Sequence, residues 1–231
     1  MNSNVRIYYY RILSAWYKRD YESSIGRTKS RRIGIPRLLF GICMVFVLSI
    51  SLGFSEVIVY VNTLYPDWTG WMNVDTSNYV YVSGSEADPY TLPATFNDSL
   101  LSLAPNTNAY NPPASISCIM DAIFLKTDDS LSGSVVTFKG YCISNTLVKP
   151  YASMAFIRDF ASDYSSYVST NVPLKTGTAF SITMRTKVSK DGRHIQYGFE
   201  TIGPVANPAT ATQLGRVLIL TSNNPTSYKQ W

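Results

Sequence analysis

The only histidine of the chain, His194, is the first residue to consider for chemistry. It lies near Gln196 and Glu200 on the polar face of an alternating stretch that predicts a β-strand. The sequence argues against a zinc site of ordinary composition, because it has one histidine and no Cys-x-x-Cys pair. A serine hydrolase needs a positioned base, and no Gly-x-Ser-x-Gly motif is present. We therefore predict a solvent-facing histidine rather than a catalytic one.

Acidic and glycine-containing motifs give no stronger signal. Asp128 and Asp129 are adjacent in the turn-like stretch TDDSLSG, so turn chemistry explains them better than a paired acid and base. The stretch GSVVTFKG lacks the Lys-Ser/Thr of a phosphate-binding loop. Asn97 starts an Asn-Asp-Ser glycosylation acceptor, which matters only in a eukaryotic secretory route. The sequence predicts a protein that is not an enzyme, with no cofactor and no metal.

Two cysteines, Cys118 and Cys142, lie in segments rich in strand-forming residues, 115–126 and 134–144. If these segments pair as an antiparallel hairpin with its turn at Ser130, the two cysteines face each other. The spacing then predicts a disulfide, provided that the compartment is oxidising. Two free thiols, or a bridge between other strands, are the alternatives.

An apolar segment over residues 38–54 has no charged side chain, and with residues 55–61 it predicts a transmembrane helix of about 36 Å at roughly 1.5 Å per residue. Residues 1–37 carry nine Lys or Arg against two acidic residues, a net of +7, whereas residues 62–231 have a net of −1. This asymmetry predicts a cytoplasmic amino terminus by the positive-inside rule. A cleaved signal peptide and a buried helix of a soluble protein are the alternatives.

Aromatic residues follow the apolar segment. Tyr60, Tyr65, Trp68 and Trp71 predict a belt at the membrane interface, where such rings have one wet edge and one apolar edge. The alternative is a loop that places these rings in a protein core.

The basic arm, residues 1–37, contains a second candidate interaction site. Ile12, Leu13 and Trp16 lie on one stripe of a predicted amphipathic helix, which could dock on the inner face of the membrane or on a partner protein. A short helix without a specific partner is equally compatible with the pattern.

The remaining residues predict an α+β domain over residues 115–222, preceded by a stalk over 62–114 and followed by a tail over 223–231. Apolar residues at helical spacing after Pro150 predict one amphipathic helix of about 18 residues. Alternating residues around 178–188 and 193–202 predict a hairpin, and residues 215–222 predict a central strand. We expect a curved antiparallel sheet packed on the helix, and one further short helix near residues 96–103.

These elements together predict a single-pass protein of the cell inner (plasma) membrane, with its carboxyl domain periplasmic or extracytoplasmic. The layout, rather than any motif, is similar to that of bitopic inner-membrane components of bacterial secretion and conjugation systems. It implies a non-enzymatic subunit of an envelope-spanning assembly, whose partners are membrane lipid, other protein subunits and a possible second copy, with no nucleic acid. A surface or virion membrane protein with a β-rich binding domain is the alternative, and an anchored extracytoplasmic enzyme is the third.

Overall fold

The structure, a computed structural model, describes residues 55–61, 68–88, 91–97, 99–111, 118–189 and 191–221. Within these ranges the regular structure consists of β-strands and two short 3-10 helices. The strands are β1 (Glu56–Tyr60), β2 (Thr69–Asp75), β3 (Tyr81–Ala87), β4 (Ala94–Asn97), β5 (Leu100–Leu103), β6 (Ile119–Thr127), β7 (Val135–Asn145), β8 (Ala152–Ala161), β9 (Tyr167–Pro173), β10 (Thr178–Arg185), β11 (Arg193–Pro204) and β12 (Val217–Leu220). The 3-10 helices are η1 (Asp129–Leu131) and η2 (Ala211–Leu214).

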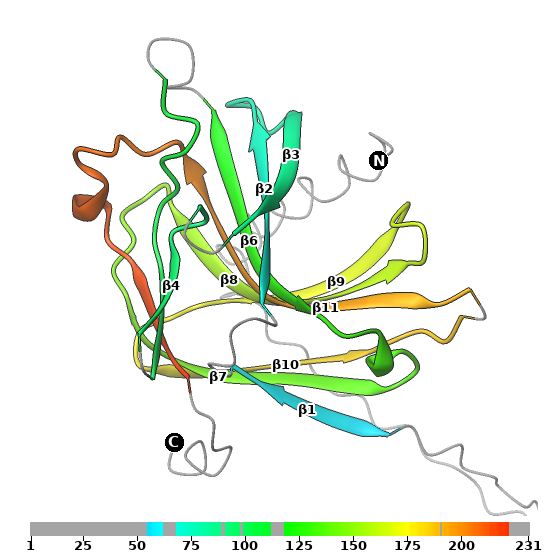
Figure 1. Ribbon diagram of the computed structural model, residues 1–231. Helices are drawn as coiled ribbons and strands as arrows, with labels where there is room; N and C mark the ends of the chain where they lie inside the picture. The colour runs from blue at the N-terminus through cyan, green and yellow to red at the C-terminus, as the bar shows by residue number, and fades with distance from the viewer. Residues whose placement is uncertain are drawn as a thin grey trace, which may run out of the picture. The chain divides into compact units, whose positions relative to one another are not determined.

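The strands form two sheets, which we call sheet A and sheet B. Sheet A has the order β1-β7-β12-β5-β4, with β10 also paired to β7, and sheet B has the order β3-β2-β6-β11-β8-β9. Strand β1 runs parallel to β7, and the other pairs are antiparallel. Figure 1 shows β7 and β10 side by side in one layer, with β11, β8 and β9 in the other.

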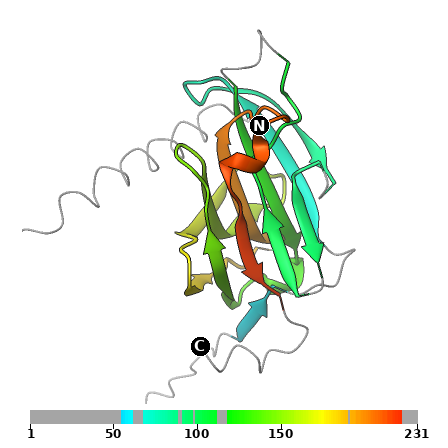
Figure 2. The same ribbon diagram turned by 90° about the vertical axis from the view of Figure 1, so that its left-hand side faces the viewer.

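The strand order within the sheets is that of a jelly roll. Four neighbouring strands of sheet A, β5-β12-β7-β10, face four of sheet B, β6-β11-β8-β9. Along the chain from β5 to β12, each connection passes from one sheet to the other except the β8–β9 hairpin. This alternation defines the double-sheet jelly roll. In Figure 2 the red strand β12 lies between green strands, in agreement with its pairing to β5 and β7. Of the remaining strands, β2 and β3 extend sheet B beyond β6, β4 extends sheet A beyond β5, and β1 pairs with the inner strand β7.

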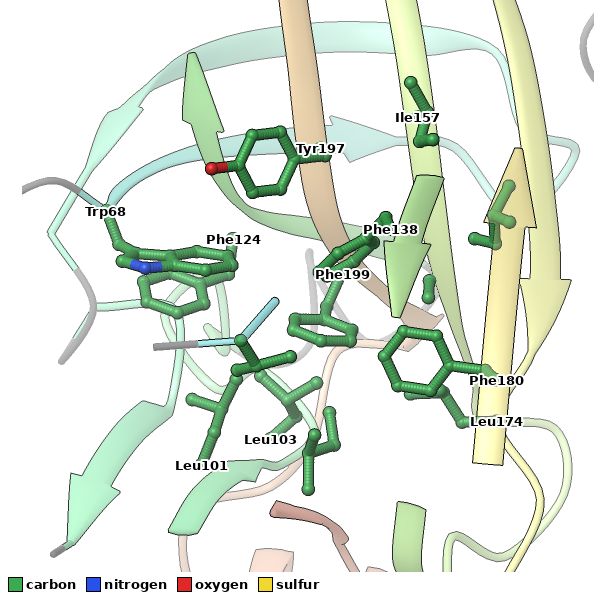
Figure 3. Packing of buried hydrophobic residues seen from close by; sticks show 14 of the residues in the cluster. Trp68, Leu101, Leu103, Phe124, Phe138, Ile157, Leu174, Phe180, Tyr197 and Phe199 are labelled. Atoms are coloured by element: carbon green, nitrogen blue, oxygen red, sulfur yellow. The ribbon is translucent and has the colours of Figure 1, made fainter. Parts of the chain in front are cut away.

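The core lies between the sheets and combines aliphatic side chains with a group of aromatic rings (Figure 3). Phe138 and Phe180 of sheet A meet Phe199 of sheet B, with ring centroids 5.3 to 5.9 Å apart. Such offset and edge-to-face contacts add to the stabilisation that comes from removing the rings from water. This aromatic layer holds the two sheets in register.

Strands β10 and β11 confirm the predicted alternation but not the predicted hairpin. Phe180, Ile182 and Met184 face the core from β10, and Ile195, Tyr197 and Phe199 face it from β11. However, β10 pairs with β7, and β11 pairs with β6 and β8. The two strands lie in opposite sheets because the segment between them crosses the sandwich, where the Lys187 amide donates to Asp159 Oδ2 at 2.8 Å.

The predicted amphipathic helix after Pro150 is wrong, and with it the α+β fold class, since the described part of the chain contains no α-helix. Residues 152–161 form β8, and residues 167–173 form β9. Both faces of β8 are buried from Ser153 to Phe160. A strand that is buried on both faces matches a helical period as well as a strand period, so periodicity alone could not separate the two.

The predicted single-pass topology and inner-membrane location are also corrected. Residues 56–60, the end of the expected transmembrane helix, form strand β1, in which Val57 and Val59 pack against the core. None of the helices among the described residues has the length and apolar character that crossing a membrane requires. Residues 38–54 lie outside the described ranges. Residues 56–60 (EVIVY) contain three consecutive β-branched residues, which favour a strand, and they pair with β7 instead of continuing a helix.

Residues predicted as a stalk supply β2 to β5. The short helix expected near 96–103 is instead the β4–β5 hairpin, in which Asn97 is opposite Leu100. Side chains of a strand point alternately to its two faces, and Leu101 and Leu103 of β5 point into the core.

Candidate functional site

The cysteines do not form the predicted disulfide. Cys118 and Cys142 are free thiols. The predicted hairpin is absent because β6 pairs with β2 and β11, while β7 pairs with strands of sheet A. Cys142 is buried in the core, and this burial raises the pKa of its thiol to about 11. A thiol that stays protonated at neutral pH is a poor nucleophile.

His194 contacts two acceptors at the end of β11. Its Nδ1 lies 2.9 Å from Asp129 Oδ2, and its Nε2 lies 3.2 Å from the backbone oxygen of Ser162. The ring stacks on Tyr164 with centroids 4.3 Å apart. Each ring nitrogen already faces a hydrogen-bond acceptor, so neither is placed to take a proton from a nucleophile in this arrangement.

The adjacent aspartates have the predicted turn role. Asp128 caps η1, because its Oδ1 accepts hydrogen bonds from the Ser130 amide at 3.1 Å and the Ser130 hydroxyl at 2.5 Å. Asp129 instead contacts His194. The two carboxylates therefore do not face a common substrate position, and the described residues contain no cluster of three groups that could hold a metal ion.

The four aromatics of the predicted interface belt are separated in the structure. Trp68 is 2% exposed and stacks on Phe124 with ring centroids 5.0 Å apart, which is the core position of the alternative interpretation (Figure 3). Trp71 is 37% exposed on β2, and Tyr60 ends β1. Tyr65 and the predicted docking residues Ile12, Leu13 and Trp16 lie outside the described ranges.

A chain of buried polar side chains crosses four strands on the face of sheet B that points away from the core. The Trp71 indole donates to Asn73 Oδ1 at 2.8 Å, and Asn73 Nδ2 donates to Asp121 Oδ2 at 3.0 Å. Arg158 Nη2 donates to Glu200 Oε2 at 2.8 Å. Asp121 and Glu200 lie at diagonal positions on the neighbouring strands β6 and β11, which brings these two pairs together. We call Trp71, Asn73, Asp121, Glu200 and Arg158 the polar chain.

Burial raises the pKa of Asp121 well above its ordinary value, and the nearby charge of Glu200 raises it further. Arg158 and the hydrogen bond from Asn73 lower the pKa of Asp121, but their effect is smaller. The guanidinium of Arg158 also lies 4.1 Å from the centroid of the Phe156 ring. A cation held over an aromatic face and paired with a buried carboxylate is fixed in position on this face.

Sequence reasoning missed the polar chain, although a signal for it was present. Asp121, Arg158 and Glu200 are charged residues inside otherwise apolar strands, as in IMDAIFL, MAFIRDF and YGFETI. A charge in such a strand is costly unless it is paired. Partners on neighbouring strands were therefore to be expected, but naming them required the sheet order.

An exposed apolar stretch lies beside the edge strand β3. Tyr79, Val80, Tyr81 and Val82 are consecutive, and each is at least 41% exposed, with Val82 at 59%. Strand β3 has one neighbour, β2, so its other backbone edge is open among the described strands. We call residues 79–82 with Trp71 the edge patch. Open strand edges with apolar side chains are sites of intermolecular pairing.

Comparisons with known proteins give one distant structural similarity. No family model matches the sequence, and no curated protein does. Among solved structures, the enzymatically active domain of tailspike protein 4 of bacteriophage CBA120 is similar with a TM-score of 0.32 and 13% identity. The match covers 67% of this chain and 18% of the tailspike chain.

Proposed function

We propose that this chain is a structural subunit, rather than an enzyme, and that it associates with other subunits through its jelly-roll domain. The observation that carries the proposal is the edge patch, a run of four exposed apolar residues beside the open strand of an extended sheet. Jelly rolls include shell-forming domains, which pack against copies of themselves. Among the described residues, His194 has both ring nitrogens facing hydrogen-bond acceptors and Cys142 is buried, so neither favours a competing catalytic function.

Pairing at β3 combines two contributions. An added strand would satisfy the backbone groups of the open edge, as in β-strand addition. Tyr79 and Tyr81 would bury large rings at little cost in side-chain entropy, which is why tyrosine is enriched at interfaces. A second copy of the chain is the simplest partner, because symmetric pairing of one edge with itself closes a dimer.

Replacing Val82 with glutamate is expected to lower the degree of association of the full-length chain. A carboxylate on the open edge would have to be desolvated on pairing, and we expect a weakening of at least tenfold in the dissociation constant. Sedimentation equilibrium over a range of concentrations measures the change.

Val188→Glu is the matched control, because Val188 is 78% exposed in the loop after β10 and lies away from the β3 edge. Val168→Glu, on the opposite edge strand β9, reports whether association joins β3 to β9 instead of β3 to β3. A monomeric wild-type chain, or a Val82→Glu chain that associates as the wild type does, would contradict the proposal.

A second function, binding of a polyanion by the arm, is favoured by the charge distribution. The net +7 of residues 1–37 precedes a domain whose residues 62–231 have a net of −1. Segments with this density of basic residues are typical of arms that bind nucleic acid. A basic arm on a shell-forming domain would neutralise nucleic acid enclosed by the shell.

Binding of a random single-stranded DNA by the full-length chain is expected to weaken steeply with salt. Changing Arg31 and Arg32 to glutamine should reduce the slope of log K against log salt by roughly 1.4, since each phosphate contact contributes about 0.7. Arg185→Gln together with Arg216→Gln removes the same charge from the domain and should leave the slope unchanged. A slope that does not respond to the arm variant would refute this second function.

A further inference from the structure

The centre of the polar chain contains more negative than positive groups. Asp121 on β6 and Glu200 on β11 are 4% and 1% exposed, and Arg158 on β8 is their cation. Asp75 on β2 is also buried, on the same side of its strand as Asn73. Two tyrosines also lie near them, Tyr81 opposite Asp75 and Tyr167 beside the Arg158 guanidinium, and Glu86 is opposite Trp71.

The register of the strands explains why the two carboxyl groups meet. Asp121 is directly opposite Asn73 on one side and Ile202 on the other, which puts Glu200 on the diagonal. Gly198 lies opposite Phe156, so no side chain at position 198 separates Arg158 from Glu200. Diagonal neighbours on one face of a sheet are within reach of such side chains.

Two carboxyl groups can share a hydrogen bond only when one of them carries a proton. Asp121 Oδ2 already accepts from Asn73, and its Oδ1 is buried with no hydrogen-bond donor among the described groups. Glu200 has Arg158 as its ion-pair partner. A proton on Asp121, donated to Glu200, therefore satisfies both groups and balances the charge of the pair against that of the guanidinium.

We propose that Asp121 and Glu200 hold one shared proton, and that losing it loosens the attachment of β2 and β3 to the rest of sheet B. Two buried carboxylates side by side repel each other, and water must reach them to relieve the repulsion. Strands β2 and β3 lie outside the eight-stranded jelly roll and are bonded to it through β6 alone within sheet B. Their separation from β6 would expose Asp121 to water.

The direction of the pH dependence follows from linkage. The pKa of Asp121 is raised in the folded chain above its ordinary 3.8, so the folded chain binds more protons than the opened one. Its contribution to stability is complete below about pH 4 and is lost as pH rises toward the folded pKa. Within that window, opening of β2 and β3 increases by up to about tenfold per pH unit. Any effect of this opening on association through the edge patch rests on the proposed function, whereas the opening itself is independent of it.

Hydrogen exchange of the full-length chain tests the proposal, with peptides from β2 and β3 compared with peptides from β8 and β11 between pH 5 and pH 8. After correction for intrinsic exchange, we expect protection of β2 and β3 to fall by at least tenfold relative to β8 and β11. Asp121→Asn keeps the shape and cannot ionise, so it should abolish this fall. Glu200→Gln leaves one carboxyl group for Arg158 and should abolish it as well, which provides a second test if one variant does not fold.

Asp163→Asn is the control, because Asp163 is an exposed carboxylate in the β8–β9 turn. It should retain the wild-type response. An unchanged response in Asp121→Asn or Glu200→Gln, or a response that Asp163→Asn also removes, would overturn the proposal. Hydrogen exchange can also be measured in the Val82→Glu chain, which is expected to associate less. A missing pH response in that chain cannot be attributed to association, so the two failures are distinguishable.

Discussion

Replacing Arg158 with methionine is expected to lower the free energy of unfolding by about 3 to 5 kcal/mol, because it removes one partner of a buried ion pair. Arg158 Nη2 lies 2.8 Å from Glu200 Oε2, and both side chains are nearly inaccessible to water. Without the guanidinium, Glu200 faces Asp121 with no cation to balance it. Urea denaturation followed by tryptophan fluorescence at neutral pH measures the loss.

Two control variants separate charge from packing. The double variant Arg158→Met with Glu200→Met removes both charges and should recover most of the loss, since apolar replacement of a whole buried pair is often close to neutral. Arg185→Met changes an exposed arginine at the end of β10 and should alter the free energy of unfolding by less than about 0.5 kcal/mol. A stable Arg158→Met chain would mean that water reaches Glu200.

The alternation of single strands was the most predictable part of the fold. Phe180, Ile182 and Met184 repeat at every second residue, and a strand with one wet face produces this pattern. The pairing of β10 was not predictable in the same way. In a jelly roll, consecutive strands lie in opposite sheets, so the partner of a strand is set by contacts that are distant in sequence.

The errors in helix prediction have one common physical cause. Strand β8 is buried on both faces, and the segment before β1 is mostly apolar, with no charged residue over 38–54. Neither segment displays the alternation that distinguishes a strand from a helix. The predicted pairing of Cys118 with Cys142 failed for another reason, because it assumed a hairpin between two segments that lie in opposite sheets.

The polar chain connects the fold to the proposed function. Asn73 and Trp71 lie on β2, the strand that bonds the edge strand β3 to the sheet. Gly84 of β3 has no side chain, and a Cβ atom there would lie 2.7 Å from Asn73 Oδ1 and 3.0 Å from the Trp71 indole nitrogen. The glycine therefore allows β3 to pack against the polar chain. A short series of contacts therefore runs from Asp121 through Asn73 to β3, the strand that carries part of the edge patch.

Replacing Trp68 with alanine is expected to destabilise the domain by about 3 to 5 kcal/mol, the range for loss of a large aromatic side chain from a core. The indole stacks on Phe124 at 5.0 Å and lies parallel to Phe199 at 6.2 Å. It also meets the edges of Phe96 and Tyr197, so the cavity would be surrounded by rings from both sheets and could collapse only in part.

Trp71→Ala is the matched control, because the same residue type lies two positions after the start of β2 with its side chain partly exposed. Its loss removes one hydrogen bond to Asn73 and should cost about 1 kcal/mol. Thermal unfolding of the full-length chain compares the two variants. If both tryptophans belonged to the predicted interface belt, the two substitutions would have similar, small effects on the stability of the domain. The core position of Trp68 instead requires a large difference between the two variants. Equal midpoints for the two variants would place Trp68 outside the core and contradict the packing between the sheets.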